Sequence, residues 1–263
     1  MSEILSVLKP LKDSSRYHRK EALTALAEND VQMANENYEA ARAAINEALD
    51  YLKALGAPDA ESTTRASEVE ITIAEQLADC WGILGGVYRA QGNDYLSAAK
   101  DAYDEGNKYE SSTRFNILST YNRVNRLVVR ILIDPHLLSD PPPVVADIPG
   151  PVKKTMRELL SETDTEIERQ LLAGRNDRAW ALADQVMVRL LGDLPKVEIA
   201  LNDLDESAGT KTFVYDSTLK VIRDLIERKL PMQDKLITTG EQLRAKLPAT
   251  LKGAPLAPES MVA

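Results

Sequence analysis

The sequence predicts an all-α protein of about nine to eleven helices that pack as antiparallel pairs. Apolar residues recur at three- and four-residue steps through most of the chain, as on one face of a helix. No segment alternates apolar and polar residues around β-branched side chains, so no sheet is predicted. Aromatic residues make up only 5% of the chain, and a core of Leu, Ile, Val and Ala favours helices.

Residues 1–133 are predicted to form an N-terminal helical half. Its clearest stripe follows Tyr38, Ala41, Ile45 and Leu49, and Gly56 ends that helix. Asp13 or Ser14 and Asn29 or Asp30 are the residue types that cap helices. The expected helices cover residues 13–28, 30–55, 64–90, 94–109 and 112–133.

Residues 134–150 are predicted to form a proline-rich loop, because five prolines there remove backbone donors and favour extended geometry. Residues 151–247 form the C-terminal helical half. Pro151 is expected to open its first helix, Gly192 to end its second, and Pro231 to start or kink its last. Residues 248–263 are predicted to be a flexible tail.

Charge and composition narrow the classes of partner and compartment. A net charge of −9 makes nucleic acid an unlikely partner, because duplex binding requires a dense positive face. The one cysteine, Cys80, fits a reducing compartment. The longest apolar run contains Arg130 and is too short to span a membrane. With no signal peptide recognisable at the N-terminus, the sequence predicts a cytoplasmic protein without membrane partners.

The stretch from Trp81 to Tyr95 contains four glycines and could be read as a phosphate-binding loop. No buried strand precedes it, and no Lys-Ser/Thr pair follows the glycines. Their spacing matches neither nucleotide-binding glycine motif. These glycines are therefore predicted to allow close helix packing.

Trp81, Leu84, Gly85 and Tyr88 have the W-x2-L-G-x2-Y spacing of the first helix of a tetratricopeptide repeat, and the chain resembles that family over about residues 78–110. Ala99 and Tyr103 match packing residues of the repeat's second helix. The turn is about two residues longer than usual, and a glycine, Gly106, replaces an alanine. Flanking segments look like degenerate repeats, and they more loosely resemble repeat-like regulatory regions of signalling, stress and bacterial defence proteins.

The resemblance implies a short solenoid of stacked helix pairs that binds another protein. First helices of such pairs commonly line a concave face. The partner, a peptide or a helix, would lie there in a groove left open by small residues. The positions expected on that face are Asp79, Gly82, Gly86, Arg89 and Asn93.

Arg123, Arg126 and Arg130 share one face of the expected helix 112–133 and are further candidates for partner binding. Arginine binds carboxylates and phosphates through paired hydrogen bonds, so the same stripe could form an anion pocket. The protein would then be a nucleotide- or anion-sensing regulator. Alternatively, the arginines pair within the chain, for which the acidic candidates are Asp101, Asp104 and Glu105.

Catalytic chemistry is not expected. The only histidines are His18 and His136, so a zinc site or a nucleophile–histidine pair has few possible members. We therefore expect no metal, no cofactor and no small-molecule substrate. The spacing of Arg130 and His136 loosely resembles the R-x4–6-H element of all-helical HEPN-like ribonucleases, although Pro135 intervenes and Ile131 replaces the usual polar residue. The leading hypothesis is a non-enzymatic interaction scaffold or regulatory subunit.

Overall fold

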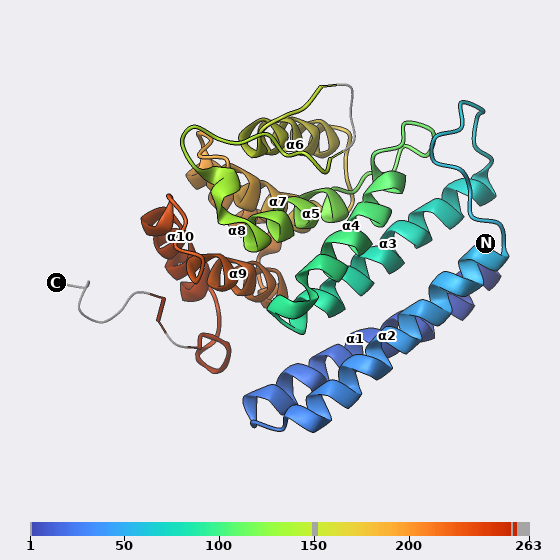
Figure 1. Cartoon of the computed structure of the whole chain (residues 1–263), viewed down its shortest axis with the longest axis horizontal. Coiled ribbons are helices and arrows are strands. Elements are labelled where there is room, and N and C mark those ends of the chain that lie inside the picture. Colours follow the sequence, from blue (N-terminus) through green and yellow to red (C-terminus); the bar gives the residue numbers. More distant parts are fainter. Residues whose placement is uncertain (1, 149–151, 254, 257–263) are drawn as a thin grey trace. The chain divides into compact units, whose positions relative to one another are not determined.

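The computed structural model describes residues 2–148, 152–253 and 255–256 and confirms the all-α prediction (Figure 1). Within those ranges it contains ten α-helices and three short 3-10 helices, and its only β-pairing is an isolated bridge between Val144 and Thr155. The chain divides into two compact units, Met1–Val129 and Arg130–Ala263.

The first unit consists of two helix pairs and the start of a fifth helix (Figure 1). Helices α1 and α2 form one antiparallel hairpin, and α3 and α4 form the other. The short helix η1 joins α3 to α4 at Asn93–Tyr95. The bounds are α1 Ser2–Ala27, α2 Val31–Ala54, α3 Glu68–Ala90, α4 Leu96–Glu110 and α5 Tyr121–Ile133.

The prediction that the first helix starts near Asp13 or Ser14 is wrong, because α1 begins at Ser2 and continues through Pro10. Asp13 lies within the helix and forms an ion pair with Lys9 one turn earlier. The early turns are held by packing, since Leu8 is buried in the core shared by all four helices of the two pairs. This burial compensates for the backbone donor that Pro10 lacks.

The next two helices begin at strong capping residues. The Asp30 side chain accepts a hydrogen bond from the backbone N–H of Met33, which confirms one of the two predicted caps for α2. Helix α3 starts four residues later than expected, because Ser67 and Glu70 form a reciprocal capping box. Hydrogen bonds from Ser67 and from Arg114 lower the pKa of Glu70 to about 2.

The helix expected over residues 112–133 begins only at Tyr121, and the segment before it is not helical. Arg114 donates to the backbone carbonyls of Asp59 and Thr64, at 2.8 Å each. Phe115 and Ile117 pack in a small core with the start of α3. Tertiary contacts to the loop before α3 therefore replace the helical hydrogen bonds of this segment.

Among its described residues, the second unit contains five further helices, one of which is α7, and twelve of the fourteen residues of α7 are buried. Helix α6 begins after Thr155, which forms a capping box with Glu158. Pro151, the predicted start of this helix, lies outside the described residues. Gly192 follows α7 as predicted, and Pro231 lies two residues before α10. The bounds are α6 Met156–Leu172, α7 Arg178–Leu191, α8 Val197–Ala208, α9 Thr212–Ile226 and α10 Gln233–Ala245, with η2 Pro135–Leu138 and η3 Ala249–Leu251.

The described part of the predicted tail contacts α9 and α10. The Lys252 carbonyl accepts hydrogen bonds from Arg223 and Arg244, and the Leu256 N–H donates to Glu241. Residues 257–263 lie outside the described residues.

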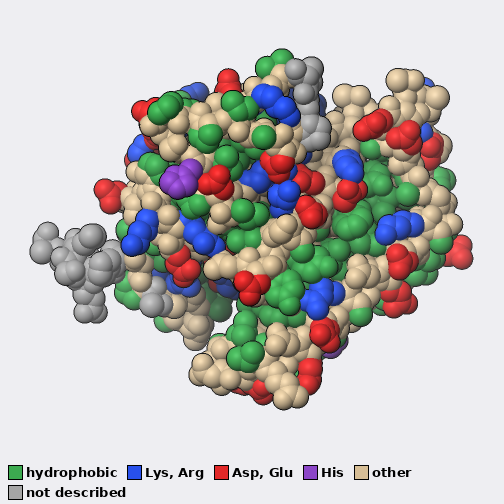
Figure 2. Space-filling model, viewed as in Figure 1, with side chains coloured by type: hydrophobic (Ala, Val, Ile, Leu, Met, Phe, Trp, Pro, Cys, Tyr) green, Lys and Arg blue, Asp and Glu red, His purple; other side chains and the backbone are tan. Residues whose placement is uncertain are grey.

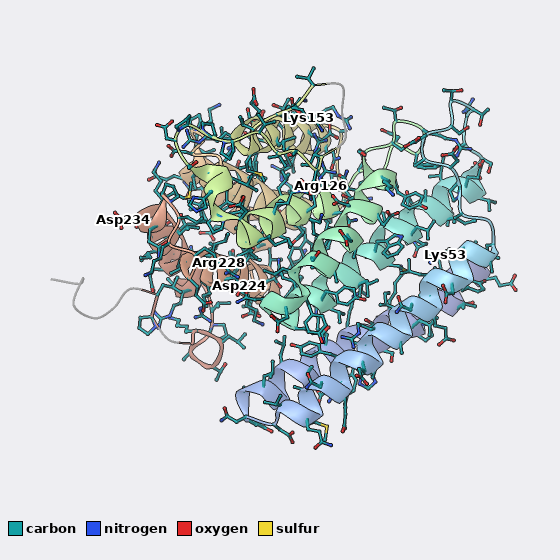
Figure 3. All side chains as sticks on the ribbon, in the orientation of Figure 1. Lys53, Arg126, Lys153, Asp224, Arg228 and Asp234 are labelled. Atoms are coloured by element: carbon teal, nitrogen blue, oxygen red, sulfur yellow. The ribbon has the colours of Figure 1, made fainter. Side chains whose placement is uncertain are left out.

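Charged side chains of both signs are mixed on the face seen in Figure 2, and apolar side chains gather there over α3 and α4. Figure 3 labels Lys53, which lies near the end of α2.

None of the described helices combines the length and the apolarity needed to cross a membrane.

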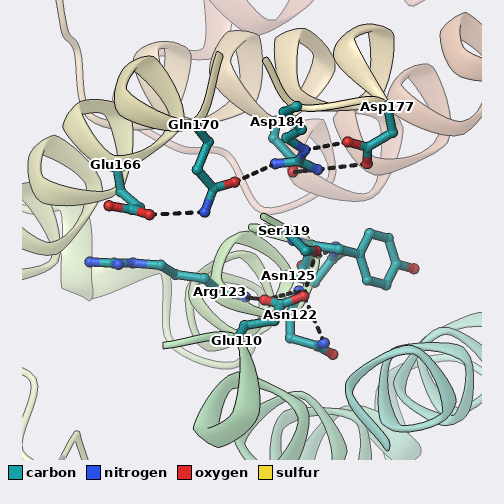
Figure 4. Close-up of polar contacts among 11 residues, drawn as sticks. Glu110, Ser119, Asn122, Arg123, Asn125, Glu166, Gln170, Asp177 and Asp184 are labelled. Atoms are coloured by element: carbon teal, nitrogen blue, oxygen red, sulfur yellow. Dashed lines mark hydrogen bonds and ion pairs between the residues drawn. The ribbon is translucent and has the colours of Figure 1, made fainter. Parts of the chain in front are cut away.

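A buried carboxylate, Glu110, fixes the start of α5 (Figure 4). It accepts hydrogen bonds from the backbone N–H groups of Asn122 and Arg123, at 3.0 and 3.1 Å. It also accepts from the Ser119 hydroxyl at 2.7 Å and from the Asn122 amide at 3.0 Å. A negative charge near these first N–H groups also interacts favourably with the dipole of α5. Burial nonetheless raises the pKa of Glu110 above its ordinary value.

We predict that Glu110→Ala lowers the free energy of unfolding by about 1.5–3 kcal/mol, because four donors lose a charged acceptor. Urea denaturation measures this change. Amide hydrogen exchange should accelerate at Asn122 and Arg123. The control is Glu105→Ala, which removes only a surface ion pair with Lys108 and should cost about 0.5 kcal/mol or less. Equal losses in the two variants would contradict the capping role.

Candidate functional site

The α3–α4 pair closes tightly around Gly85. A Cβ atom built on Gly85 would lie only 2.7 Å from the ring of Tyr103 on α4. Tyr103 and Ala99 are fully buried, and Leu84 is nearly so. A larger residue at position 85 would therefore force the two helices apart.

Trp81 and Tyr88 are half-buried and pack on the edge of the core that contains Leu84. The two residues are seven positions apart, so they lie on the same side of α3. Part of each ring remains exposed on that side.

The expected open groove at Gly82 and Gly86 is absent from the described structure, because both glycines are buried by the first unit's own residues. A Cβ on Gly82 would lie 2.9 Å from the Tyr121 ring. A Cβ on Gly86 would lie 2.7 Å from a guanidinium nitrogen of Arg19. The sequence shows that these positions are small, but not which residues cover them.

The other residues predicted on that face are more accessible. Asp79 is exposed and pairs with Lys12 at 2.7 Å and with Arg16 at 3.7 Å. Arg89 is half-buried and donates to the side-chain oxygen of Asn125 at 2.9 Å. Asn93 is exposed at the start of η1. Asp79 and Arg89 thus contribute to packing between helices.

Two members of the arginine stripe have carboxylate partners within their own units. Arg126 lies 3.7 Å from Asp104, one of the three acidic partners proposed from the sequence. Arg130 pairs with Asp147 at 3.0 Å. Arg123 contributes its backbone N–H to the Glu110 cap. The internal-pairing alternative therefore describes Arg126 correctly, and Arg130 finds a partner that the sequence did not suggest.

A row of aromatic rings with two cations marks one surface of the first unit. Tyr95 stacks on Tyr88 with ring centroids 6.3 Å apart, and it is 38% exposed. The Arg42 guanidinium lies 5.9 and 5.8 Å from these two ring centroids. The Lys53 ammonium lies 5.5 Å from the Trp81 ring centroid. We call Trp81, Tyr88, Tyr95, Arg42 and Lys53 the aromatic row.

Only Trp81 and Tyr88 of this row were singled out from the sequence, as packing residues. Arg42 and Lys53 come from α2 and Tyr95 from η1, so no spacing within one helix relates them to Trp81. Their cation–π distances could be found only once α2 was placed beside α3.

The structure also shows the surroundings of the two histidines and of the cysteine. His18 forms a hydrogen bond with Asn37, at 2.9 Å between Nδ1 and Oδ1. His136 is exposed in η2, and its backbone N–H donates to Asp134. Burial raises the pKa of the Cys80 thiol to about 12, so the reactive thiolate is disfavoured. Among the described residues, no group of three His, Cys, Asp or Glu side chains could hold a metal ion.

The second unit has a polar cleft of about 390 Å³ between α8 and α10. Its lining includes Glu198, Asn202, Asp205, Gln242 and Lys246. Within it Lys246 pairs with Asp205, so the one basic group of this lining already has a partner. The cleft offers less specific chemistry than the aromatic row.

We predict that alanine has different effects on stability at two adjacent glycines. Gly85→Ala should lower the free energy of unfolding by about 1–3 kcal/mol, because the buried Tyr103 ring cannot move away. Gly86→Ala should change it by less than about 1 kcal/mol, because helix propensity improves and the end of Arg19 can shift. Urea denaturation of both variants measures the difference. Equal stabilities would show that Tyr103 does not fix the distance between α3 and α4.

Comparison with known proteins found no match: no family model, no curated protein and no solved structure matches the chain.

Proposed function

We propose that the protein is a non-enzymatic interaction module of tetratricopeptide-repeat type, which binds a segment of a partner protein at the aromatic row. This proposal rests on one observation: three half-exposed or exposed aromatic rings lie close to two cations on one surface. Trp, Tyr and Arg are the residue types that dominate binding energy at protein interfaces.

The repeat-like part of the proposal rests on how the two helix pairs share a core. Leu8 and Ile45 from the α1–α2 hairpin pack with Leu84 and Ala102 from the α3–α4 pair. A solenoid requires this arrangement, because each pair leaves an apolar face that a neighbouring pair must cover. The hairpin helices are 26 and 24 residues long and α4 is 15, so the two pairs are unequal in length.

The row suits a partner segment with apolar side chains between acidic ones. The exposed parts of Tyr95 and Trp81 would cover apolar groups, and the basic groups of Arg42 and Lys53 would attract carboxylates. Both cations already lie against aromatic rings, so little rotamer freedom would be lost on binding. An enzymatic role has weaker support, since Cys80 is held as a buried thiol and His18 is engaged with Asn37.

The test compares Tyr95→Ala and Tyr17→Ala. Tyr17 is a matched control, because it is a 58% exposed tyrosine on another helix of the same unit. Each purified chain is used to capture proteins from an extract of the source cells, and the retained proteins are quantified by mass spectrometry. A partner at the aromatic row should be retained by the native chain and by Tyr17→Ala. Its affinity for Tyr95→Ala should fall about tenfold or more.

Arg42→Ala serves as the second variant, since it removes the cation from two rings without shortening an aromatic side chain. Circular dichroism establishes that each variant keeps its helices. The proposal fails if the same proteins bind all four chains equally, or if none binds the native chain.

A further inference from the structure

Polar groups from three helices converge on the backbone of α3 at Gly86. A Cβ atom built there would lie 2.7 Å from a guanidinium nitrogen of Arg19, 3.6 Å from the Tyr121 hydroxyl and 3.7 Å from the Tyr103 hydroxyl. These three groups belong to α1, α5 and α4, all within the first unit. Because each lies within 4 Å of one point, they form a single polar cluster.

The cluster is positively charged. The guanidinium of Arg19 is half-buried, and within the described part of the chain it has neither a hydrogen bond nor an ion pair. Arg89 lies on α3 three residues after Gly86, on the same side of the helix. It donates a hydrogen bond to the side-chain oxygen of Asn125.

One neutral group of the cluster also lacks a hydrogen-bond partner. The Tyr103 hydroxyl is fully buried and has no hydrogen-bond partner among the described residues. An unsatisfied buried hydroxyl costs about 1–3 kcal/mol. Native structures therefore rarely keep such a group unless a further molecule satisfies it.

We propose that this cluster binds a phosphate group, with Arg19 and Arg89 as the charged ligands and the hydroxyls of Tyr103 and Tyr121 as further donors. Arginine forks match the oxygen geometry of phosphate and carboxylate groups. Phosphate fits better here, since its three free oxygens can accept from two guanidinium groups and from hydroxyls together. Arg19, Arg89 and Tyr121 are half-buried, so part of the cluster is exposed to solvent, whereas Tyr103 is fully buried.

This site is distinct from the aromatic row and does not depend on the proposed protein-binding role. None of its four ligands belongs to the row. Failure of one proposal therefore leaves the other intact, because Tyr95→Ala alters only the row and Arg19→Gln alters only the cluster.

Isothermal titration of the full chain with sodium phosphate, at constant ionic strength adjusted with sodium chloride, tests the site. Arg19→Gln removes the charge at similar length and should weaken binding about tenfold or more. Gly86→Ala should weaken it as well, because the new methyl group would lie 2.7 Å from a guanidinium nitrogen of Arg19 and would make this group shift. The matched control is Arg16→Gln on the same helix, which is exposed and pairs with Asp13 and Asp79. It should bind phosphate as the native chain does.

Loss of binding in Arg19→Gln and Gly86→Ala, with binding retained in Arg16→Gln, supports the site. If the native chain does not bind phosphate at a concentration of about 10 mM, the proposal is wrong. Equal binding by all variants also overturns it and would indicate general attraction to basic side chains. A parallel titration with phosphoserine identifies the source of the group. Tighter binding than inorganic phosphate indicates a phosphorylated side chain, equal binding indicates a free phosphate, and both support the site.

Discussion

The close approach of neighbouring helices to α3 is the constraint on which the first unit depends. Three glycines of this helix each meet a side chain from a different element: Gly82 meets Tyr121, Gly85 meets Tyr103 and Gly86 meets Arg19. A side chain at any of these positions would meet atoms closer than 3.0 Å. Helix α3 is therefore the central element against which α1, α4 and α5 are positioned.

The placement of small residues on α3 also determines where its large aromatic side chains are exposed. Because Gly82, Gly85 and Gly86 take up the closely packed faces, the large rings of Trp81 and Tyr88 lie on a side that is only partly covered. There they meet cations from α2, so an amphipathic surface is assembled from residues with no fixed relation in sequence. Packing and exposure of α3 are consequences of the same distribution of small and large side chains.

Much of this arrangement could be predicted from local pattern, and the failures have definite causes. The periodic stripe of α2 and the glycine opposite an aromatic residue in the α3–α4 pair act within one or two helices, where spacing is informative. The starts of α1 and α5 depend on partners far along the chain. Leu8 holds the turns around Pro10, and Glu110 supplies the cap that makes α5 begin at Tyr121. Helical propensity alone contains neither contact.

The surroundings of Arg19 could not be predicted from local sequence pattern. Ser15, Arg19 and Ala22 fall at four- and three-residue steps within the predicted helix, but the sequence does not show which residues lie against this stripe. An arginine on a buried stripe opposes burial unless its charge is compensated. In this unit a guanidinium nitrogen lies next to Gly86, where two tyrosine hydroxyls are also close. An anion bound there would touch α1, α3, α4 and α5 together, so its binding energy would also stabilise the packing of these helices on α3.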